Sequence, residues 1–207
     1  MIPAAESLQR LREGNRRFAA DAPAHAGTGF RTRRIETAPN QEPFAVILGC
    51  ADSRVPAEIV FDQGLGDLFV IRVAGNIVAP SQIGSVEFAA ERTGARLVVV
   101  LGHSRCGAIL ATLEEMARPS KEQSRGLRSI VERVRPAIEP ILMSQITPTD
   151  DALIRRAVRA NVTASVSHLR HGSEILERLI QTDGLVIVGA EYCLETGVVE
   201  FFDGVQA

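Results

Sequence analysis

One segment of this chain reads FAVILGCADSR over residues 44–54. Its first five residues, Phe44–Leu48, form a continuous apolar run, which is the pattern of a strand buried on both faces of a sheet. The run ends in Gly49 and Cys50, so a turn that carries a thiol follows the strand. A second segment reads LVVVLGHSRCG over residues 97–107 and ends in a similar way, with a histidine and a cysteine after the apolar run. The two segments predict buried strands whose carboxyl ends carry metal-binding side chains.

Further apolar runs extend this pattern to a mostly parallel sheet. Runs at Leu68–Arg72 and Leu185–Val188 bring the predicted parallel strands to four, and Val198–Phe202 adds an edge strand after a turn. Helical patterns lie between the strands, over residues 83–93, 107–117, 124–135, 150–170 and 173–181. Buried strands that alternate with helices are typical of an α/β fold in which helices flank a central sheet.

The first part of the chain has a different character. Leu8, Leu11 and Phe18 fall at helical spacing among charged residues and predict an amphipathic N-terminal helix. The stretch Asp21–Pro43 is rich in alanine, proline, glycine, threonine and arginine, and its lack of a period predicts an extended connector. We therefore expect a helix and extended arm over residues 1–43, followed by a single α/β catalytic domain over residues 44–207.

Composition excludes several classes of protein. The chain has 207 residues, 45% of them hydrophobic, and a net charge of -2, which argues against an obligate nucleic-acid binder. Its apolar runs fall far short of the roughly 20 residues that span a membrane, and no signal peptide is visible. Three cysteines are too few, and odd in number, for a secreted disulfide framework. We expect a cytoplasmic protein with no membrane partner, in which Cys193 is a packed core thiol.

The residues that follow the predicted strands at 44–48 and 97–101 predict a metal site. Parallel sheets place ligands beyond the carboxyl ends of their strands, so neighbouring strands would bring Cys50, His103 and Cys106 together. Two thiolates and one imidazole suit Zn²⁺, and three protein ligands leave a fourth position open, as in catalytic zinc sites. Three glycines flank these ligands and fit sharp turns or close backbone approach: Gly49, Gly102 and Gly107.

Asp52 and Arg54 follow the first cysteine and form a second informative pair. A guanidinium can hold a carboxylate through paired hydrogen bonds and keep it ionised. Beside a zinc-bound hydroxide, such a carboxylate accepts the hydroxide proton in a hydrogen bond and so orients the nucleophile. Asp52 is also close enough in sequence to bind the metal itself as a conditional fourth ligand. The sequence allows both arrangements.

The segments CADSR at 50–54 and HSRCG at 103–107 together resemble the zinc signature of the β-class carbonic anhydrases. The resemblance covers most of the chain, including the N-terminal helix. It extends to FVIR at 69–72, AGN at 74–76, GSVEFA at 84–89 and VGAEY at 188–192. The pair of zinc motifs is specific, whereas either motif alone is weak.

The resemblance implies a function and an assembly. It implies reversible hydration of carbon dioxide to bicarbonate and a proton by a zinc-bound hydroxide, with one Zn²⁺ per subunit. Cys50, His103 and Cys106 would be the ligands, and Asp52 with Arg54 the catalytic dyad. It also implies a homodimer or homotetramer, with the N-terminal helix reaching over a neighbour and the active site near the subunit interface.

The same resemblance names substrate-binding positions and separates two subtypes. The positions are Gln41, Phe69, Phe88 and Gly107, and Phe88 stands where plant-like members commonly have tyrosine. One subtype has a tryptophan three residues before the first zinc cysteine, where this chain has Ile47 and no tryptophan anywhere. The other has a glutamine nine residues before that cysteine, which Gln41 matches. The match favours an open site without a regulatory bicarbonate pocket.

Other interpretations of the same residues remain. A related zinc hydrolase of CS₂ or COS would need the same ligands, as would a non-catalytic zinc-binding regulatory protein on this scaffold. The cluster could also be a closed structural zinc site, although a fourth cysteine or histidine at finger-like spacing is missing. A thiol nucleophile at Cys50 with His103 as its base is a further alternative, which would leave Cys106 without a role.

Overall fold

The computed structural model describes residues 2–24, 30–118, 124–143 and 150–205, and within them five strands form one sheet in the order β2-β1-β3-β4-β5. Strands β1 to β4 run parallel, with β2 at one edge of the sheet, and β5 pairs antiparallel with β4 at the other edge. This confirms the predicted α/β fold with four parallel strands and an edge strand. The strands are β1 Ala45–Gly49, β2 Leu68–Arg72, β3 Leu97–His103, β4 Val186–Tyr192 and β5 Val199–Asp203.

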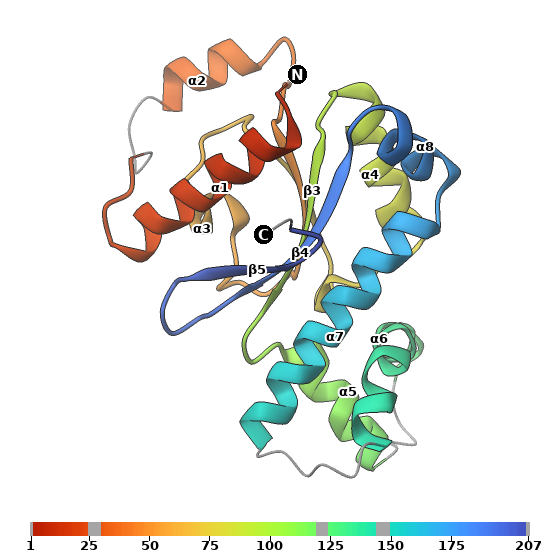
Figure 1. Cartoon of the computed structure of the whole chain (residues 1–207). Helices are drawn as coiled ribbons and strands as arrows, with labels where there is room; N and C mark the ends of the chain where they lie inside the picture. Colours follow the sequence, from red (N-terminus) through yellow and green to blue (C-terminus); the bar gives the residue numbers. More distant parts are fainter. Residues whose placement is uncertain (1, 25–29, 119–123, 144–149, 206–207) are drawn as a thin grey trace.

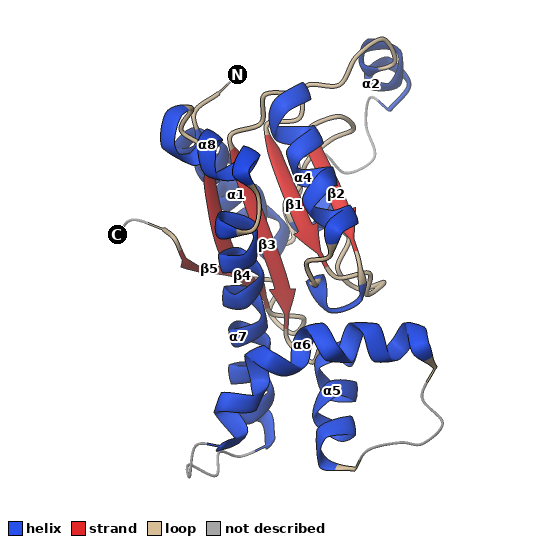
Figure 2. Cartoon of the chain, turned by 90° about the vertical axis from the view of Figure 1, so that its right-hand side faces the viewer, coloured by secondary structure: helices blue, strands red, loops and turns tan. Residues whose placement is uncertain are grey.

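Helices cover both faces of the sheet (Figures 1 and 2). On one face lie α1 and the short α3, and on the other lie α4, α8 and the upper part of the long α7. Below the carboxyl ends of the strands, α5 and α6 pack against the first half of α7. The helices are α1 Ala4–Ala19, α2 Phe30–Thr37, α3 Ala57–Val60, α4 Pro80–Arg92, α5 Gly107–Ala117, α6 Arg125–Met143, α7 Asp150–His171 and α8 Glu174–Thr182, with a 3₁₀ turn, η1, at Ala74–Asn76.

The continuous apolar runs arise because the central strands are buried on both faces. Every residue of β1 and of β3 is buried. Alternate side chains of a strand point to opposite faces, so Val46 joins the core under α4, α7 and α8 while Ile47 joins the core under α1 and α3. Two hydrophobic cores therefore hold the sheet in a fixed position between its helical layers.

A third core lies at the carboxyl edge of the sheet and contains two of the predicted metal ligands. Cys50 and Cys106 pack there with Ile109 of α5, Val134 of α6 and Val158 of α7. Apolar side chains on three helices thus enclose the ends of β1 and β3. The predicted metal site is built into this packed region rather than into a surface loop.

Gly102 shows a close approach and not a turn. It lies inside β3, which continues through it to His103. A Cβ at Gly102 would lie 2.5 Å from Val162 Cγ2, so the absence of a side chain lets α7 pack directly on the strand. By contrast, a Cβ at Gly107 would meet no atom within 4 Å.

The sequence predicted that the arm is extended, and for part of the arm this prediction is wrong. Residues 25–29 lie outside the described residues, and Phe30–Thr37 forms helix α2. Its helical period was invisible because none of its residues is buried. Polar bonds hold it instead, since Arg33 donates to the Leu65 carbonyl at 2.8 Å and to Asp67 at 2.5 Å.

Three predicted boundaries also change. Strand β4 runs past the predicted end at Val188 to Tyr192, because Glu191 is paired with Arg159 at 2.7 Å and can be buried. Strand β3 is two residues longer than its apolar run. Helix α6 continues past Pro136 to Met143, with Ile138 fully buried beyond the proline. In the described part of the chain, no helix combines the length and apolar character needed to cross a bilayer.

Candidate metal centre

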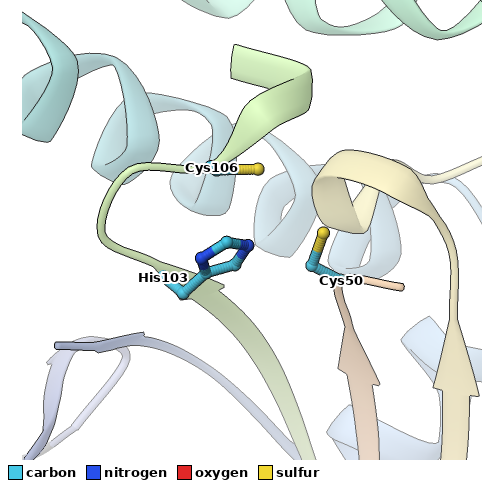
Figure 3. Close-up of side chains that lie close together, drawn as sticks. All are labelled: Cys50, His103 and Cys106. Carbon is cyan, nitrogen blue, oxygen red and sulfur yellow. The ribbon is translucent and has the colours of Figure 1, made fainter. Parts of the chain in front are cut away.

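Cys50, His103 and Cys106 converge at the carboxyl edge of the sheet (Figure 3). Their ligand atoms all lie within 4.8 Å of one another. Cys50 follows β1 directly, His103 is the last residue of β3, and Cys106 precedes the first residue of α5. Because β1 and β3 are hydrogen-bonded neighbours, their ends meet, and the predicted convergence is confirmed.

The histidine is prepared to bind through one nitrogen. Its Nδ1 lies 2.9 Å from the Ser104 carbonyl oxygen, which can only accept, so Nδ1 carries the proton. Nε2 then has a free lone pair, and it is buried with no hydrogen-bond partner among the described residues. A buried nitrogen without a partner is costly, and a metal ion between the thiols would satisfy it.

The two thiols form a coupled pair. The pKa of Cys50 is lowered to about 4, chiefly because Cys106 donates a hydrogen bond to it, with smaller help from the Gly75 backbone N–H and against the effect of burial. The pKa of Cys106 is raised, first by its hydrogen bond to Cys50 and then by burial. The opposite directions of the two pKa shifts favour a thiolate at Cys50 and a thiol at Cys106, and a divalent cation would displace the thiol proton on binding.

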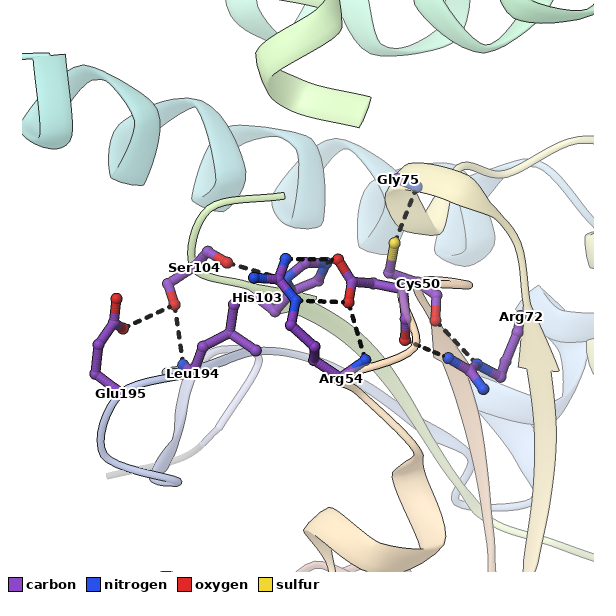
Figure 4. Close-up of polar contacts among 9 residues, drawn as sticks. Cys50, Arg54, Arg72, Gly75, His103, Ser104, Leu194 and Glu195 are labelled. Carbon is purple, nitrogen blue, oxygen red and sulfur yellow. Dashed lines mark hydrogen bonds and ion pairs between the residues drawn. The ribbon is translucent and has the colours of Figure 1, made fainter. Parts of the chain in front are cut away.

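Asp52 and Arg54 form a two-point ion pair. Figure 4 shows Arg54 beside Cys50 and His103. Arg54 Nε donates to Asp52 Oδ1 at 2.9 Å, and the terminal nitrogen donates to Oδ2 at 2.7 Å. The Arg54 backbone N–H adds a third bond to Oδ1 at 3.0 Å. These hydrogen bonds hold the pKa of Asp52 well below its usual range, so the carboxylate stays ionised.

The Asp52 carboxylate also lies near the predicted metal ligands. Asp52 Oδ2 is 3.9 Å from His103 Nε2, the nitrogen that has no other partner. In the structure both Asp52 oxygens are held by Arg54. Whether Asp52 serves as a fourth ligand therefore depends on competition between Arg54 and the cation for one carboxylate.

The predicted substrate-binding residues do not all lie beside the predicted metal ligands. Gly107 begins α5, next to the metal ligand Cys106. Phe69 and Phe88 pack on each other with ring centroids 6.2 Å apart. Phe69 pairs in register with Val46, three residues before the end of β1, so it lies toward the opposite end of the strand from the ligands. Phe88 is 51% exposed on α4.

Gln41 lies in a separate cavity of about 750 Å³ at the N-terminal side of the molecule. Among the described residues its lining includes Arg10, Arg33 and Phe44 and contains none of the three metal ligands. Within one chain, the structure thus brings Cys50, His103 and Cys106 together with Asp52, Arg54 and Gly107. It does not bring Gln41 to them.

Sequence reasoning missed two residues that hold this site. Arg72, at the end of β2, donates to the carbonyl oxygens of Cys50 at 3.0 Å and Asp52 at 2.5 Å. Its place at a strand end, like that of the ligands, was an available signal. Asn161 of α7 donates to the Gly75 carbonyl at 2.8 Å. No sequence pattern marked it, because it falls within an ordinary helical period.

The prediction for Cys193 was wrong. It is only partly buried and lies in the lining of a surface cavity with Ser104 and Glu195. Its Sγ is 3.4 Å from Glu195 Oε2. The apolar run before it ends in β4, and the chain turns outward at this residue, so strand burial does not extend to its side chain.

Comparison with known proteins gives a consistent assignment. A family model described as carbonic anhydrase matches residues 45–199. The carbonic anhydrase of Mycolicibacterium smegmatis is 39% identical over 190 residues, which cover 92% of this chain and 89% of that protein. Carbonic anhydrase 2 of Mycobacterium tuberculosis is also 39% identical, over 90% of this chain and 87% of that protein.

Solved structures share the fold. A β-carbonic anhydrase of Aspergillus fumigatus superimposes with a TM-score of 0.74 at 23% identity, covering 98% of this chain and 92% of that one. Tetrameric β-carbonic anhydrases of Sordaria macrospora give 0.74 at 22% identity, covering 98% and 100%. The Coccomyxa enzyme, solved in complex with acetazolamide, gives 0.72 at 25% identity, covering 94% and 86%. With two relatives above 30% identity and a family model spanning the sheet, the chain belongs to the carbonic anhydrase family, in its β class, a family of lyases.

Proposed function

We propose that the protein is a zinc-dependent carbonic anhydrase that catalyses the reversible hydration of carbon dioxide to bicarbonate and a proton. The observation that carries the proposal is a buried Cys50, His103 and Cys106 group within 4.8 Å, with an ionised carboxylate beside it. Family membership supports the same reaction.

The donor set fits one Zn²⁺ per subunit. Two thiols and an imidazole match the soft and borderline ligands that zinc prefers, and three of them leave one tetrahedral position open. The unpartnered Nε2 of His103 supports the same assignment. When bound there, zinc would supply a Lewis acid that lowers the pKa of a water in the site to near neutral.

Asp52 then orients the reacting water. Since Arg54 keeps Asp52 ionised, its oxygens can accept a hydrogen bond from that water at any physiological pH. The accepted proton points toward the carboxylate, so a lone pair of the water faces the substrate. The two-point hold by Arg54 also opposes movement of Asp52 into the fourth coordination position.

The substrate pocket is proposed to be completed by a neighbouring subunit. Gln41, Phe69 and Phe88 are the expected pocket residues, and Gln41 lies in a cavity apart from the ligands of its own chain. Phe88 on α4 is exposed, as are Phe30 and Ile35 on α2, which leaves apolar surface for a second copy to cover. A homodimer, or a homotetramer such as those of the Sordaria proteins, would be able to cover this surface at an interface.

Two other features complete the proposal. The three cysteines are free in the structure, and two of them must stay reduced to bind metal, which favours the cytoplasm. The Asp52–Arg54 pair favours an enzyme over a non-catalytic zinc-binding protein, because a structural zinc site needs no oriented carboxylate. Among the described residues, no observation favours CS₂ or COS over carbon dioxide.

The test combines metal analysis with stopped-flow CO₂ hydration. We expect one zinc per subunit and an activity that is lost on chelation and restored by zinc. Asp52→Asn and Arg54→Ala should each retain zinc and lose activity by a factor on the order of 10². Glu91→Gln is the matched control, because it neutralises a carboxylate paired with Arg178 at 2.8 Å on the exposed face of α4.

Two results would contradict the proposal. One is a fully active protein that contains no metal. The other is wild-type activity in zinc-loaded Asp52→Asn, which would remove the carboxylate from the mechanism.

A further inference from the structure

The η1 turn, residues Ala74–Asn76, lies against the first metal ligand (Figure 4). The Gly75 backbone N–H donates a hydrogen bond to Cys50 Sγ at 3.4 Å. Gly75 has φ of 70° and Asn76 has φ of 43°, so two consecutive residues occupy the left-handed region. This region is uncommon for residues other than glycine, and two such residues in succession persist only if their surroundings hold them.

Helix α7 supplies that hold from outside the turn. Asn161 Nδ2 donates to the Gly75 carbonyl at 2.8 Å, and Ser165 Oγ donates to the Asn76 carbonyl at 3.2 Å. The two side chains are four residues apart, so they lie on one face of the helix. Asn161 is 2% exposed, and water therefore cannot easily replace its bond. The side-chain nitrogen of Asn76 has no partner among the described residues, so it adds nothing to the turn.

We propose that Asn161 is a positioning residue that keeps the Gly75 N–H directed at the Cys50 sulfur. The inference rests on the proposed zinc site. By fixing the Gly75 carbonyl, Asn161 fixes the rotation of the residue whose N–H contacts Cys50. A thiolate that accepts this hydrogen bond donates less charge to a bound cation, which leaves the cation a stronger Lewis acid. Outer-shell contacts of this kind typically change metal affinity or activity by about 10–100-fold.

The test uses the cobalt-substituted protein, because Co²⁺ reports thiolate bonding by its sulfur-to-metal charge-transfer band. In Asn161→Ala we expect the band to move to lower energy, since a thiolate without its hydrogen bond gives up charge more easily. We also expect zinc to pass to a chelator about tenfold faster, because the turn no longer holds Cys50 in its binding position. Asn15→Ala is the matched control: Asn15 is a buried asparagine that donates to the Val60 carbonyl at 3.1 Å, on α1, across the sheet from α7. It should destabilise the fold and leave the band and the zinc release unchanged.

The outcomes separate the two proposals. A wild-type protein with no sulfur-to-cobalt band would contradict the metal centre itself. A wild-type band that is unmoved in Asn161→Ala, or moved equally in Asn15→Ala, would overturn only the role of Asn161. If Asn161→Ala does not fold, Ser165→Ala removes the longer bond to the same turn, and its band must then shift in the same direction; an unmoved band overturns the proposal.

Discussion

The contact between α7 and Gly102 makes a quantitative prediction about stability. A Cβ at Gly102 would lie 2.5 Å from Val162 Cγ2 and 3.2 Å from Val158 Cγ1. Carbon atoms pack at about 3.5–4.0 Å, so Gly102→Ala requires α7 to withdraw from β3 by about 1 Å. Both valines are buried and cannot turn into solvent. The backbone at Gly102 is not left-handed, so the effect of the methyl group is purely steric.

Overpacking of this kind costs about 1–3 kcal/mol. For a chain of this size, each kcal/mol lowers Tm by about 2–4 °C, so Gly102→Ala should lower Tm by about 2–12 °C. The measurement is thermal unfolding of the zinc-loaded protein, monitored by calorimetry. Gly126→Ala is the control, since a Cβ there meets no atom within 4 Å. Its free energy of unfolding should stay within about 1 kcal/mol of the wild type.

A second-site change tests the cause. Val162→Ala removes the methyl groups that block the new side chain, so the double variant Gly102→Ala/Val162→Ala should be more stable than the two single changes added together. Residues in contact couple by about 0.5–3 kcal/mol. Strict additivity, or a Gly102→Ala variant with wild-type Tm, would refute the steric explanation of why a glycine precedes His103.

Two further predictions concern Arg72 and Glu200. Arg72→Lys keeps the charge but not the two-pronged hold on the Cys50 and Asp52 carbonyls, so zinc content should persist while kcat for CO₂ hydration falls by about 10-fold; an unchanged kcat would show that the hold does not matter. The pKa of Glu200 is lowered from its usual 4.5, chiefly by its hydrogen bond from Arg159. A lowered pKa stabilises the folded state above pH 4.5, and this contribution is lost as pH falls through the folded value. Glu200→Gln should therefore be less stable than wild type in urea unfolding at pH 7, with a difference that shrinks below pH 4.5; a difference that grows on acidification would contradict the ion pair.

The sheet and the convergence of Cys50, His103 and Cys106 were predictable from local patterns. A strand buried on both faces must be apolar along its length, so β1 and β3 are visible in the sequence. Thiol and imidazole groups directly after such strands must lie at the sheet edge. Because β1 and β3 turned out to be neighbours, Cys50 and His103 meet as expected.

Elements held by polar contacts were not predictable in this way. Helix α2 buries none of its residues, and bonds from Arg33 to a distant loop hold it in place. Strand β4 continues through Glu191 only because Arg159, 32 positions earlier, pairs with that carboxylate. Neither helix α2 nor the end of β4 shows a periodic apolar pattern in the sequence, because the partner that stabilises each of them lies elsewhere in the chain.

The local sequence pattern was enough to indicate which side chains could bind a metal, because ligand chemistry and strand burial are properties of short segments. The contacts that position those side chains come from residues that are distant in the sequence. Asn161 donates a hydrogen bond to the Gly75 carbonyl, 86 positions earlier in the chain. The neighbouring Val162 packs against Gly102 at the point that a Cβ would otherwise occupy. Both contacts exist only because α7 packs across the ends of the strands, and long-range packing of this kind is a property of the folded chain as a whole.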